Sequence, residues 1–277
     1  MLNPVNLDEY KQQVATFFNR RTDYDGEGDF HPRLANRLLE LAPLHKGQKI
    51  LDVATGTGLV AISAAQIVGT EGKVVGVDIS PGMLNQVRQK IAAASLQNLE
   101  LIEADAEYLN FSNDSFDAIL CSSAFVYLSD IPAALHNWHC WLSKGGLVAF
   151  SCFSETSFMA PIIIKVCAKV CGVSLPNINE PLGTPETCHN LLQKAGFQDI
   201  EVRTEQFGSY LSLNDAKGSW NGRCHPKGNP LLQLSPEQLE QCNAEYIAEL
   251  EALATDKGIW TDITTFFVLA RKKVDIQ

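Results

Sequence analysis

Residues 49–78 read KILDVATGTGLVAISAAQIVGTEGKVVGVD, and this stretch decides the fold. Two short apolar runs, 49–53 and 74–78, flank a glycine turn and a longer apolar run at 59–65. Near-continuous apolar runs are typical of parallel strands that are buried on both faces. Two such strands and one helix within about 30 residues predict a βαβ unit with a right-handed crossover.

The glycine turn has the features of a ligand-binding loop. Gly56 and Gly58 lack a Cβ atom, so the backbone can bend sharply there and a ligand can approach it closely. A helix that begins near Leu59 would point its free N–H groups at that ligand. Asp78 lies 20 residues after Gly58, which is the spacing of an acid that hydrogen-bonds a ribose hydroxyl. We therefore expect a nucleoside-bearing cofactor above the strand ends.

The residues around the turn leave two kinds of cofactor open. The dinucleotide pattern G-x-G-x-x-G is incomplete, because Ala61 stands at its third glycine, although a looser form of the motif tolerates this. Asp52 lies inside the first strand, four residues before Gly56. An acid at this place would repel a pyrophosphate and would suit a cationic amine. A dinucleotide such as NAD stays open but is the less favoured cofactor.

The acid and the turn resemble the first motif of class I S-adenosylmethionine-dependent methyltransferases. Ala54 stands where that family usually has its first glycine. The resemblance continues in order along the chain, over roughly residues 10 to 155. Four further stretches resemble the second motif, the third motif, the fourth strand and the turn into the fifth strand: Val77–Leu84, Glu103–Glu107, Phe116–Ser122 and Leu142–Leu147.

This resemblance implies an α/β fold with a Rossmann-like, mostly parallel sheet of seven strands and helices on both faces. The last strand is expected to run antiparallel between the fifth and the sixth. We expect a single methyltransferase domain over residues 1–277, with helical cap insertions at 154–183 and 208–260. Residues 1–45 are expected to form helices that fold over the cofactor as a lid.

The resemblance also assigns roles to residues near the strand ends. The Asp105 carboxylate would accept from the adenine amino group, and the Ala106 N–H would reach a ring nitrogen. Ile79 and Met83 would sandwich the adenine, although plain core packing also explains them. The methionine part would lie against the backbone near Ser122. The expected cofactor-binding residues are Tyr24, Asp52, Ala54, Thr55, Gly56, Gly58, Asp78, Ile79, Met83, Asp105, Ala106 and Ser122.

Methyl transfer from a sulfonium is an in-line displacement with a good leaving group. The protein then mainly aligns donor and acceptor and excludes water. A general base is needed only if the acceptor must lose a proton. Tyr127 and His31 are the predicted catalytic residues, and Tyr24 and His225 are further candidates for the base.

Composition restricts the partners of the chain. The net charge is −10 and no basic tail is present, so we expect no nucleic-acid partner. Lys165 and Lys169 interrupt the longest apolar stretch, which is therefore too short for a membrane span. Asp8 and Glu9 precede any apolar run, unlike a signal peptide. The sequence thus favours a cytoplasmic protein.

The chain has eight cysteines and no C-x-x-C pair, so we expect no metal site. Cys167 and Cys171 share one face of a predicted helix. Arsenite methyltransferases use scattered cysteines on this fold, but the spacing here gives no clear match. Buried, reduced thiols are the favoured interpretation.

The sequence predicts an enzyme that methylates a small molecule and resembles the ubiquinone and menaquinone methyltransferases. Apolar residues in the expected cap suggest an apolar or aromatic acceptor, with O, N or C as the acceptor atom and a monomer or homodimer as the assembly. Those cap residues are Ile162, Ile163, Ile164, Val166, Trp220 and Tyr246. An NAD-dependent oxidoreductase and a non-catalytic cofactor-binding module are the alternatives.

Overall fold

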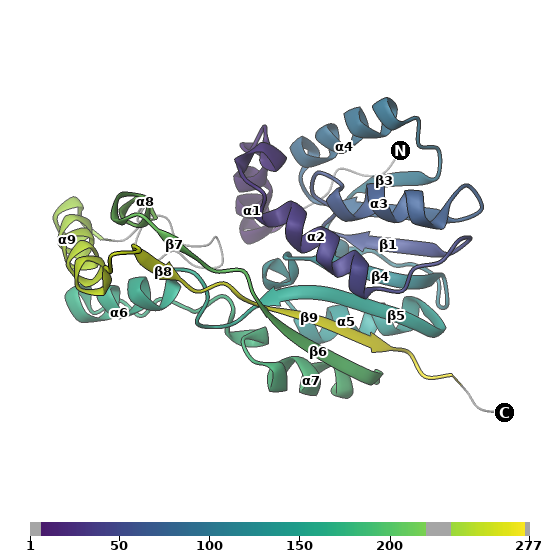
Figure 1. Ribbon diagram of the computed structural model, residues 1–277. Coiled ribbons are helices and arrows are strands. Elements are labelled where there is room, and N and C mark those ends of the chain that lie inside the picture. Colours follow the sequence, from purple (N-terminus) through teal and green to yellow (C-terminus); the bar gives the residue numbers. More distant parts are fainter. Residues whose placement is uncertain (1–6, 220–233, 275–277) are drawn as a thin grey trace. The chain divides into compact units, whose positions relative to one another are not determined.

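The computed structural model describes residues 7–219 and 234–274, and its main feature is a sheet of seven strands (Figure 1). The strand order is β3-β2-β1-β4-β5-β9-β6, mostly parallel with one antiparallel strand. The predicted fold class is confirmed. The strands are β1 Lys49–Val53, β2 Lys73–Asp78, β3 Leu99–Glu103, β4 Phe116–Ser122, β5 Leu142–Phe153, β6 Gln198–Gln206 and β9 Thr264–Arg271.

The strand β1 lies at the centre of the parallel part of the sheet. Its register places Asp52 opposite Gly76 of β2 and Leu120 of β4. The chain order reverses between β1 and β4, because β2 and β3 lie on one side and β4 and β5 on the other. Ligands of open α/β sheets bind at such a switch point, beyond the carboxyl ends of the strands.

Helices connect the strands, as the apolar periodicity predicts. Ser80 caps α4, accepting a hydrogen bond from the Met83 N–H at 3.2 Å, and Pro81 occupies the first helical position. The helices between the strands are α3 Leu59–Val68, α4 Pro81–Ala94, α5 Ile131–Trp141 and α7 Pro185–Lys194, with short 3-10 turns at η2 Ala106–Tyr108 and η3 Phe125–Tyr127.

The N-terminal segment is helical, as predicted. It contains α1 Glu9–Asn19 and α2 Phe30–Leu41, and the polar link between them holds one turn of 3-10 helix, η1 Tyr24–Glu27. Val14, Leu34 and Leu38 are buried. Hydrophobic burial on one face of each helix therefore fastens this segment to its surroundings.

Two strand boundaries differ from the prediction. We expected a turn at Leu142–Leu147 before the fifth strand, whereas β5 already begins at Leu142. Leu142 pairs with Phe116 and Leu147 pairs with Ala118, so the residues between them form an irregular bulge. Gly145 permits this bulge with a φ of +77°. The sequence predicts a sixth strand over 197–202, whereas β6 continues to Gln206.

The chain divides into two compact units. Unit 1 comprises residues 1–152, 185–203 and 267–277, and unit 2 comprises 153–184 and 204–266. The expectation of one domain with a lid and cap insertions stays a prediction. Within the described ranges, every helix is too short or too polar to cross a membrane.

Unit 2 consists of helices and a small antiparallel sheet. Its elements are α6 Ala160–Cys171, η4 Glu180–Leu182, β7 Ser209–Leu211, α8 Leu213–Gly218, α9 Pro236–Leu253 and β8 Ile259–Thr261. The sequence from Ser235 to Gln238 has the pattern of a capping box at the start of a helix, and the structure contains this box, with Gln238 as its second member. The sheet of β7 and β8 was not predicted, because strands this short carry no readable alternation.

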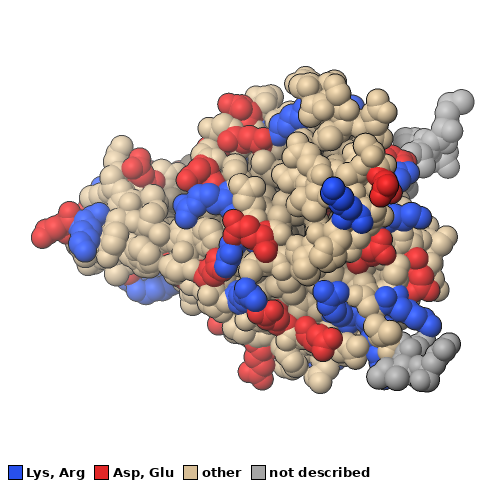
Figure 2. Space-filling view, turned by 45° about the vertical axis from the view of Figure 1, so that its right-hand side comes forward, with Lys and Arg blue, Asp and Glu red and all other residues tan. Residues whose placement is uncertain are grey.

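The charged side chains are mixed on the face shown in Figure 2. Lysine and arginine side chains alternate there with aspartate and glutamate, and no broad basic patch gathers on this face. Mixed charge of this kind is ordinary for a protein surface with a net charge of −10.

Candidate active site

Unit 1 contains a cavity at the carboxyl ends of its central strands. Every predicted site residue of unit 1 except Gly58 lines this cavity. The lining residues that were predicted are Tyr24, His31, Asp52, Ala54, Thr55, Gly56, Asp78, Ile79, Met83, Asp105, Ala106, Ser122 and Tyr127. The sequence motifs and the N-terminal segment therefore come together in one place.

The turn after β1 has three residues with left-handed backbone. Ala54, Gly56 and Gly58 have φ angles of +53°, +56° and +81°. The φ of Ala54 explains why a glycine usually stands at that position of the motif. A Cβ on Gly56 would meet no atom closer than 4.0 Å, so ligand atoms can approach this backbone.

Gly58 has a packing role and does not reach the cavity. A Cβ atom on Gly58 would lie 2.8 Å from Cγ1 of Val87 on α4. The absence of a side chain therefore lets α4 pack closely against the start of α3. Gly58 therefore belongs to the turn, where its N–H donates to the Thr55 carbonyl at 2.8 Å, but it does not line the cavity.

Two buried carboxylates hold the turn. Asp52 accepts a hydrogen bond from the Thr55 hydroxyl at 2.6 Å, and burial raises the pKa of Asp52 to about 7. Asp78 accepts from the Gly56 N–H at 2.7 Å and from the Ser80 N–H at 2.8 Å. Burial raises the pKa of Asp78 to about 6. Each carboxylate oxygen has a further lone pair with which it can accept from a ligand.

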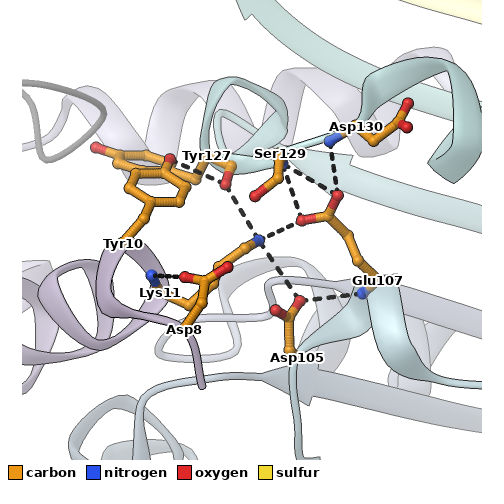
Figure 3. Close-up of polar contacts among 8 residues, drawn as sticks. All are labelled: Asp8, Tyr10, Lys11, Asp105, Glu107, Tyr127, Ser129 and Asp130. Atoms are coloured by element: carbon orange, nitrogen blue, oxygen red, sulfur yellow. Dashed lines mark hydrogen bonds and ion pairs between the residues drawn. The ribbon is translucent and has the colours of Figure 1, made fainter. Parts of the chain in front are cut away.

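A third buried carboxylate, Asp105, follows β3 and has one oxygen without a partner. Its Oδ1 accepts from the Glu107 N–H at 3.1 Å and lies 3.5 Å from Lys11 Nζ (Figure 3). Among the residues that the structure describes, no group donates to the buried Oδ2. Burial raises the pKa of Asp105. Since an unpartnered buried acceptor is costly, a hydrogen-bond donor on a ligand would stabilise the site.

Sequence reasoning missed Lys11, which lies in the same network. The Lys11 side chain is 5% exposed, and its ammonium group pairs with Glu107 and donates to the Tyr127 carbonyl at 3.3 Å. Tyr10 donates to that carbonyl at 3.1 Å (Figure 3). Lys11 precedes Val14 by one helical turn, and this position on the buried face was the available signal.

Glu107 connects the network to the loop before α5. Its carboxylate accepts from the N–H groups of Ser129 and Asp130, at distances from 2.8 to 3.0 Å. Burial opposes ionisation of Glu107, but the hydrogen bonds from Lys11 and from these backbone groups outweigh it and lower the pKa. Lys11 and Glu107 therefore form a buried ion pair beside the cavity.

Aromatic rings line another part of the cavity. Tyr24 stacks on His31 with ring centroids 4.8 Å apart, and Tyr127 packs edge-on against Phe18 at 5.3 Å. Burial lowers the pKa of His31 to about 4 and raises the pKa of Tyr127 to about 12. At neutral pH the imidazole is therefore uncharged and a weaker base than a free histidine, and the Tyr127 phenol retains its proton.

Side-chain contacts fasten α1 and η1 to the helices that begin at the cavity. The Asn19 side-chain oxygen accepts from the Ser80 hydroxyl at 2.7 Å and from the Gly82 N–H at 2.9 Å. Asp25 accepts from the Thr57 hydroxyl at 2.5 Å and forms an ion pair with Lys90. We call α1 and η1 the helix wall, and Asp52, Asp78 and Asp105 with their strand ends the strand wall.

Some predicted residues lie elsewhere. His225 and Trp220 fall outside the described residues. Val166 and Tyr246 are buried in the core of unit 2, and the Tyr246 hydroxyl donates to the Ala216 carbonyl at 3.0 Å. The expectation that these two side chains offer apolar surface to an acceptor is wrong, because packing within unit 2 uses them.

Comparisons with known proteins agree with this geometry. A family model described as a methyltransferase domain matches residues 50–146. The chain is 31% identical over 217 residues to a demethylmenaquinone methyltransferase of Staphylococcus epidermidis, covering 70% of this chain and 88% of that protein. It is 34% identical over 144 residues to the aklanonic acid methyltransferase DauC of a Streptomyces species, covering 51% of this chain and 66% of that protein.

A solved structure shows the same fold. The phosphoethanolamine N-methyltransferase 2 of Haemonchus contortus superposes with a TM-score of 0.58 and 20% identity, covering 97% of this chain and 61% of that one. The matches do not favour an NAD-dependent oxidoreductase or a non-catalytic module. The extent of the match to the staphylococcal enzyme, together with the strand wall, shows that the chain is an enzyme and belongs to the class I S-adenosylmethionine-dependent methyltransferases.

Proposed function

We propose that the chain binds S-adenosylmethionine in the cavity of unit 1 and methylates an apolar or aromatic small molecule. The observation that carries this proposal is the strand wall, where three buried carboxylates end adjacent strands and one has an unpartnered oxygen. Carboxylates suit the sulfonium and ammonium charges of this cofactor, whereas they would repel the pyrophosphate of a dinucleotide.

The residues present fit the cofactor at four points. Asp105 Oδ2 can accept from the adenine amino group, since no described residue donates to it. Asp78 can accept from the ribose hydroxyls with its remaining lone pairs, while its backbone partners hold it in position. The open backbone at Gly56 leaves room for the cofactor to lie against the turn. Ile79 and Met83 line the same cavity and can enclose the base.

S-adenosylmethionine supplies a methyl group on a sulfonium, which leaves readily without acid catalysis. The residues of the chain then have three tasks: they bind the cofactor, orient the acceptor and exclude water. The helix wall contributes Val14 and Phe18, which are apolar, to the cavity lining. His31 lines the cavity and is our candidate to take a proton from the acceptor, if the acceptor must lose one, although its lowered pKa makes it a weak base.

The names of two relatives and the residues that line the cavity indicate the chemical class of the methyl acceptor. One relative is named for a quinone, demethylmenaquinone, and the other for aklanonic acid. The cavity lining combines aromatic rings with apolar side chains such as Leu59 and Leu128. We propose a quinone-like or aromatic acceptor. The acceptor atom, the assembly and the location of the protein stay predictions.

Two measurements test the proposal separately. Isothermal titration should show binding of S-adenosylmethionine and no binding of NAD; the reverse result would reject the cofactor. A screen with S-adenosylmethionine labelled on its methyl group should then label a short-chain demethylmenaquinol or aklanonic acid, with a small aliphatic amine as the control. Labelling of the amine alone would reject the acceptor class and leave the cofactor assignment standing.

A further inference from the structure

Unit 2 contains a cluster of three thiols that the proposed methyl transfer does not use. Cys167 and Cys171 lie one turn apart on α6, and Cys242 lies on α9. The sulfur atoms of Cys171 and Cys242 are 2.7 Å apart, although 71 residues separate them in sequence. Cys167 and Cys242 are fully buried, while Cys171 is partly exposed.

The surroundings of the cluster argue against a metal site. Within residues 7–219 and 234–274, no three or more histidine, cysteine or acidic side chains are placed so that they could hold a metal ion. The Cys171 thiol has the Gln238 carbonyl 3.6 Å away. Lys169 lies two residues before Cys171, and its ammonium group is paired with Glu245 on α9. The cluster thus consists of the Cys171 and Cys242 thiols in contact, with the Cys167 thiol as their neighbour.

We propose that Cys171 and Cys242 are a redox modification site and form a reversible disulfide when the protein meets a peroxide. The contact between the two sulfur atoms and the solvent access of one of them carry this assignment. Disulfide formation needs its two sulfur atoms to approach to about 2.05 Å, which from this starting contact requires little movement of the helices.

The step balances with hydrogen peroxide as the oxidant. The Cys171 thiol gives up its proton as its sulfur attacks one peroxide oxygen: an S–O bond forms, the O–O bond breaks, and the leaving hydroxide takes up that proton as water, so Cys171 becomes a sulfenic acid. The Cys242 sulfur then attacks the Cys171 sulfur, and the S–S bond forms as the S–O bond breaks. The hydroxyl leaves with the Cys242 proton as water. In total, two thiols and one peroxide give one disulfide and two waters.

The order of these steps follows from exposure. Peroxide can reach Cys171, whereas Cys242 is enclosed by the unit 2 core. Burial, together with the neighbouring Cys171 thiol, raises the pKa of the Cys242 thiol, so Cys242 is the less reactive of the two toward peroxide. Cys171 is therefore the attacking sulfur and Cys242 the resolving one.

The disulfide would connect two helices that form the core of unit 2. Val166 of α6 and Leu250 of α9 belong to the same buried cluster as Cys242. A bond between positions 171 and 242 closes a long loop and so restricts the unfolded chain. We expect the midpoint of thermal unfolding to rise by roughly 5 °C, and to return when dithiothreitol reduces the bond.

Peptide mapping of the full chain tests the proposal. The protein is exposed to a small excess of hydrogen peroxide, free thiols are alkylated, and the digest is analysed by mass spectrometry. The expected product is a peptide that joins Cys171 to Cys242, lighter by two hydrogen atoms than its reduced parts, and absent after dithiothreitol. Cys152 and Cys188 provide an internal control, because their sulfur atoms are 3.7 Å apart but both are buried, so they should stay reduced.

Variants separate this pair from the other thiols. Cys171→Ser should abolish the linked peptide and the thermal shift, whereas Cys140→Ser, at a partly exposed cysteine of unit 1, should retain both. A Cys224→Ser background removes a thiol that lies outside the described residues. The proposal is overturned if Cys171 accumulates as sulfenic or sulfinic acid without a partner, or if Cys242 pairs with Cys167 instead. The wild-type map decides this even if a variant does not fold.

Discussion

The two walls of the cavity in unit 1 are built differently. In the strand wall, Asp52 and Asp78 lie in paired parallel strands, so the sheet fixes their spacing, and Asp105 follows β3 by two residues. In the helix wall, α1 and η1 are held by individual side chains, among them Lys11 and Asn19. The strand wall is thus pre-organised mainly by backbone pairing, whereas the helix wall depends on side-chain contacts and on the burial of its apolar face.

This difference suggests a division of work. A fixed set of carboxylates is suited to recognising the cofactor, while a segment held by side chains is suited to admitting and enclosing it. The walls meet at Asp105, whose Oδ1 faces Lys11 and whose Oδ2 has no described donor. Changes in the strand wall should therefore affect cofactor recognition most, and changes in the helix wall should affect closure.

The largest effect is expected from Asp78→Ala. The variant removes the acceptor for two backbone N–H groups and, in our proposal, for the ribose hydroxyls. Loss of charged hydrogen bonds of this kind should weaken S-adenosylmethionine binding by about 100-fold, measured by titration calorimetry. Asp117→Ala is the matched control, because Asp117 also accepts a backbone N–H, at 2.8 Å from Lys49, but at the start of β4. Unchanged affinity in Asp78→Ala would show that the cofactor lies elsewhere.

A smaller effect is expected from Lys11→Met in the helix wall. The variant keeps the apolar stem but leaves Glu107 and Asp105 without their cation. Cofactor affinity should fall by about 20-fold, and protease cleavage within α1 should become faster because the wall opens more often. Lys73→Met, which breaks an exposed ion pair with Glu100, should do neither. If Lys11→Met lost as much cofactor affinity as Asp78→Ala, the proposed difference between the two walls would be contradicted.

The pH dependence of binding should also distinguish the walls. Burial raises the pKa of Asp52 to about 7 and of Asp78 to about 6, so both acids hold protons in the ligand-free protein below these values. A cationic cofactor prefers the ionised acids, so affinity should rise about tenfold from about pH 6 to about pH 8 and then level off. Asp52→Asn should flatten this profile, and affinity that falls over this range would contradict the assignment.

The stability of the ligand-free protein should change in the opposite direction. The folded acids retain protons that the unfolded chain has already lost above its ordinary pKa of about 4. The free energy of unfolding should therefore fall as pH rises from about 4, and level off above the pKa values of Asp78 and Asp52, at about 6 and about 7. Chemical denaturation at several pH values measures this, and an Asp52→Asn variant should reduce the slope.

The smallest effect is expected from Ala54→Gly. Glycine relieves the left-handed strain at a φ of +53°, which is worth about 1 kcal/mol. It also raises the conformational entropy of the unfolded chain, which lowers stability by a similar amount. Stability should stay within about 1 kcal/mol of the wild type, and cofactor affinity should change by less than about twofold. Ala64→Gly, in the right-handed interior of α3, should cost about 1 kcal/mol. Equal losses in the two variants would contradict the strain argument.

The strand wall could be anticipated from sequence because its determinants are local. The first strand, the glycine turn and Asp78 lie within about 30 residues, and the βαβ geometry fixes how they meet. The helix wall could not be read in the same way. Lys11 pairs with Glu107, which is 96 residues away in sequence, and Asn19 accepts from Ser80, which is 61 residues away. No short sequence pattern encodes such pairs. Likewise, Gly58 matched the motif, but a glycine is needed there because a side chain would collide with Val87 on α4.

The lone oxygen of Asp105 has a consequence for which purine the enzyme accepts. An ionised carboxylate can only accept hydrogen bonds. No described residue donates to Asp105 Oδ2, so this oxygen is available to accept from a ligand. Inosine carries a keto oxygen where adenosine carries an amine. In the deaminated cofactor this oxygen would face Asp105 Oδ2, and both atoms are hydrogen-bond acceptors that repel each other. If Asp105 receives the adenine amino group as we propose, the hypoxanthine analogue should bind more weakly because of this repulsion.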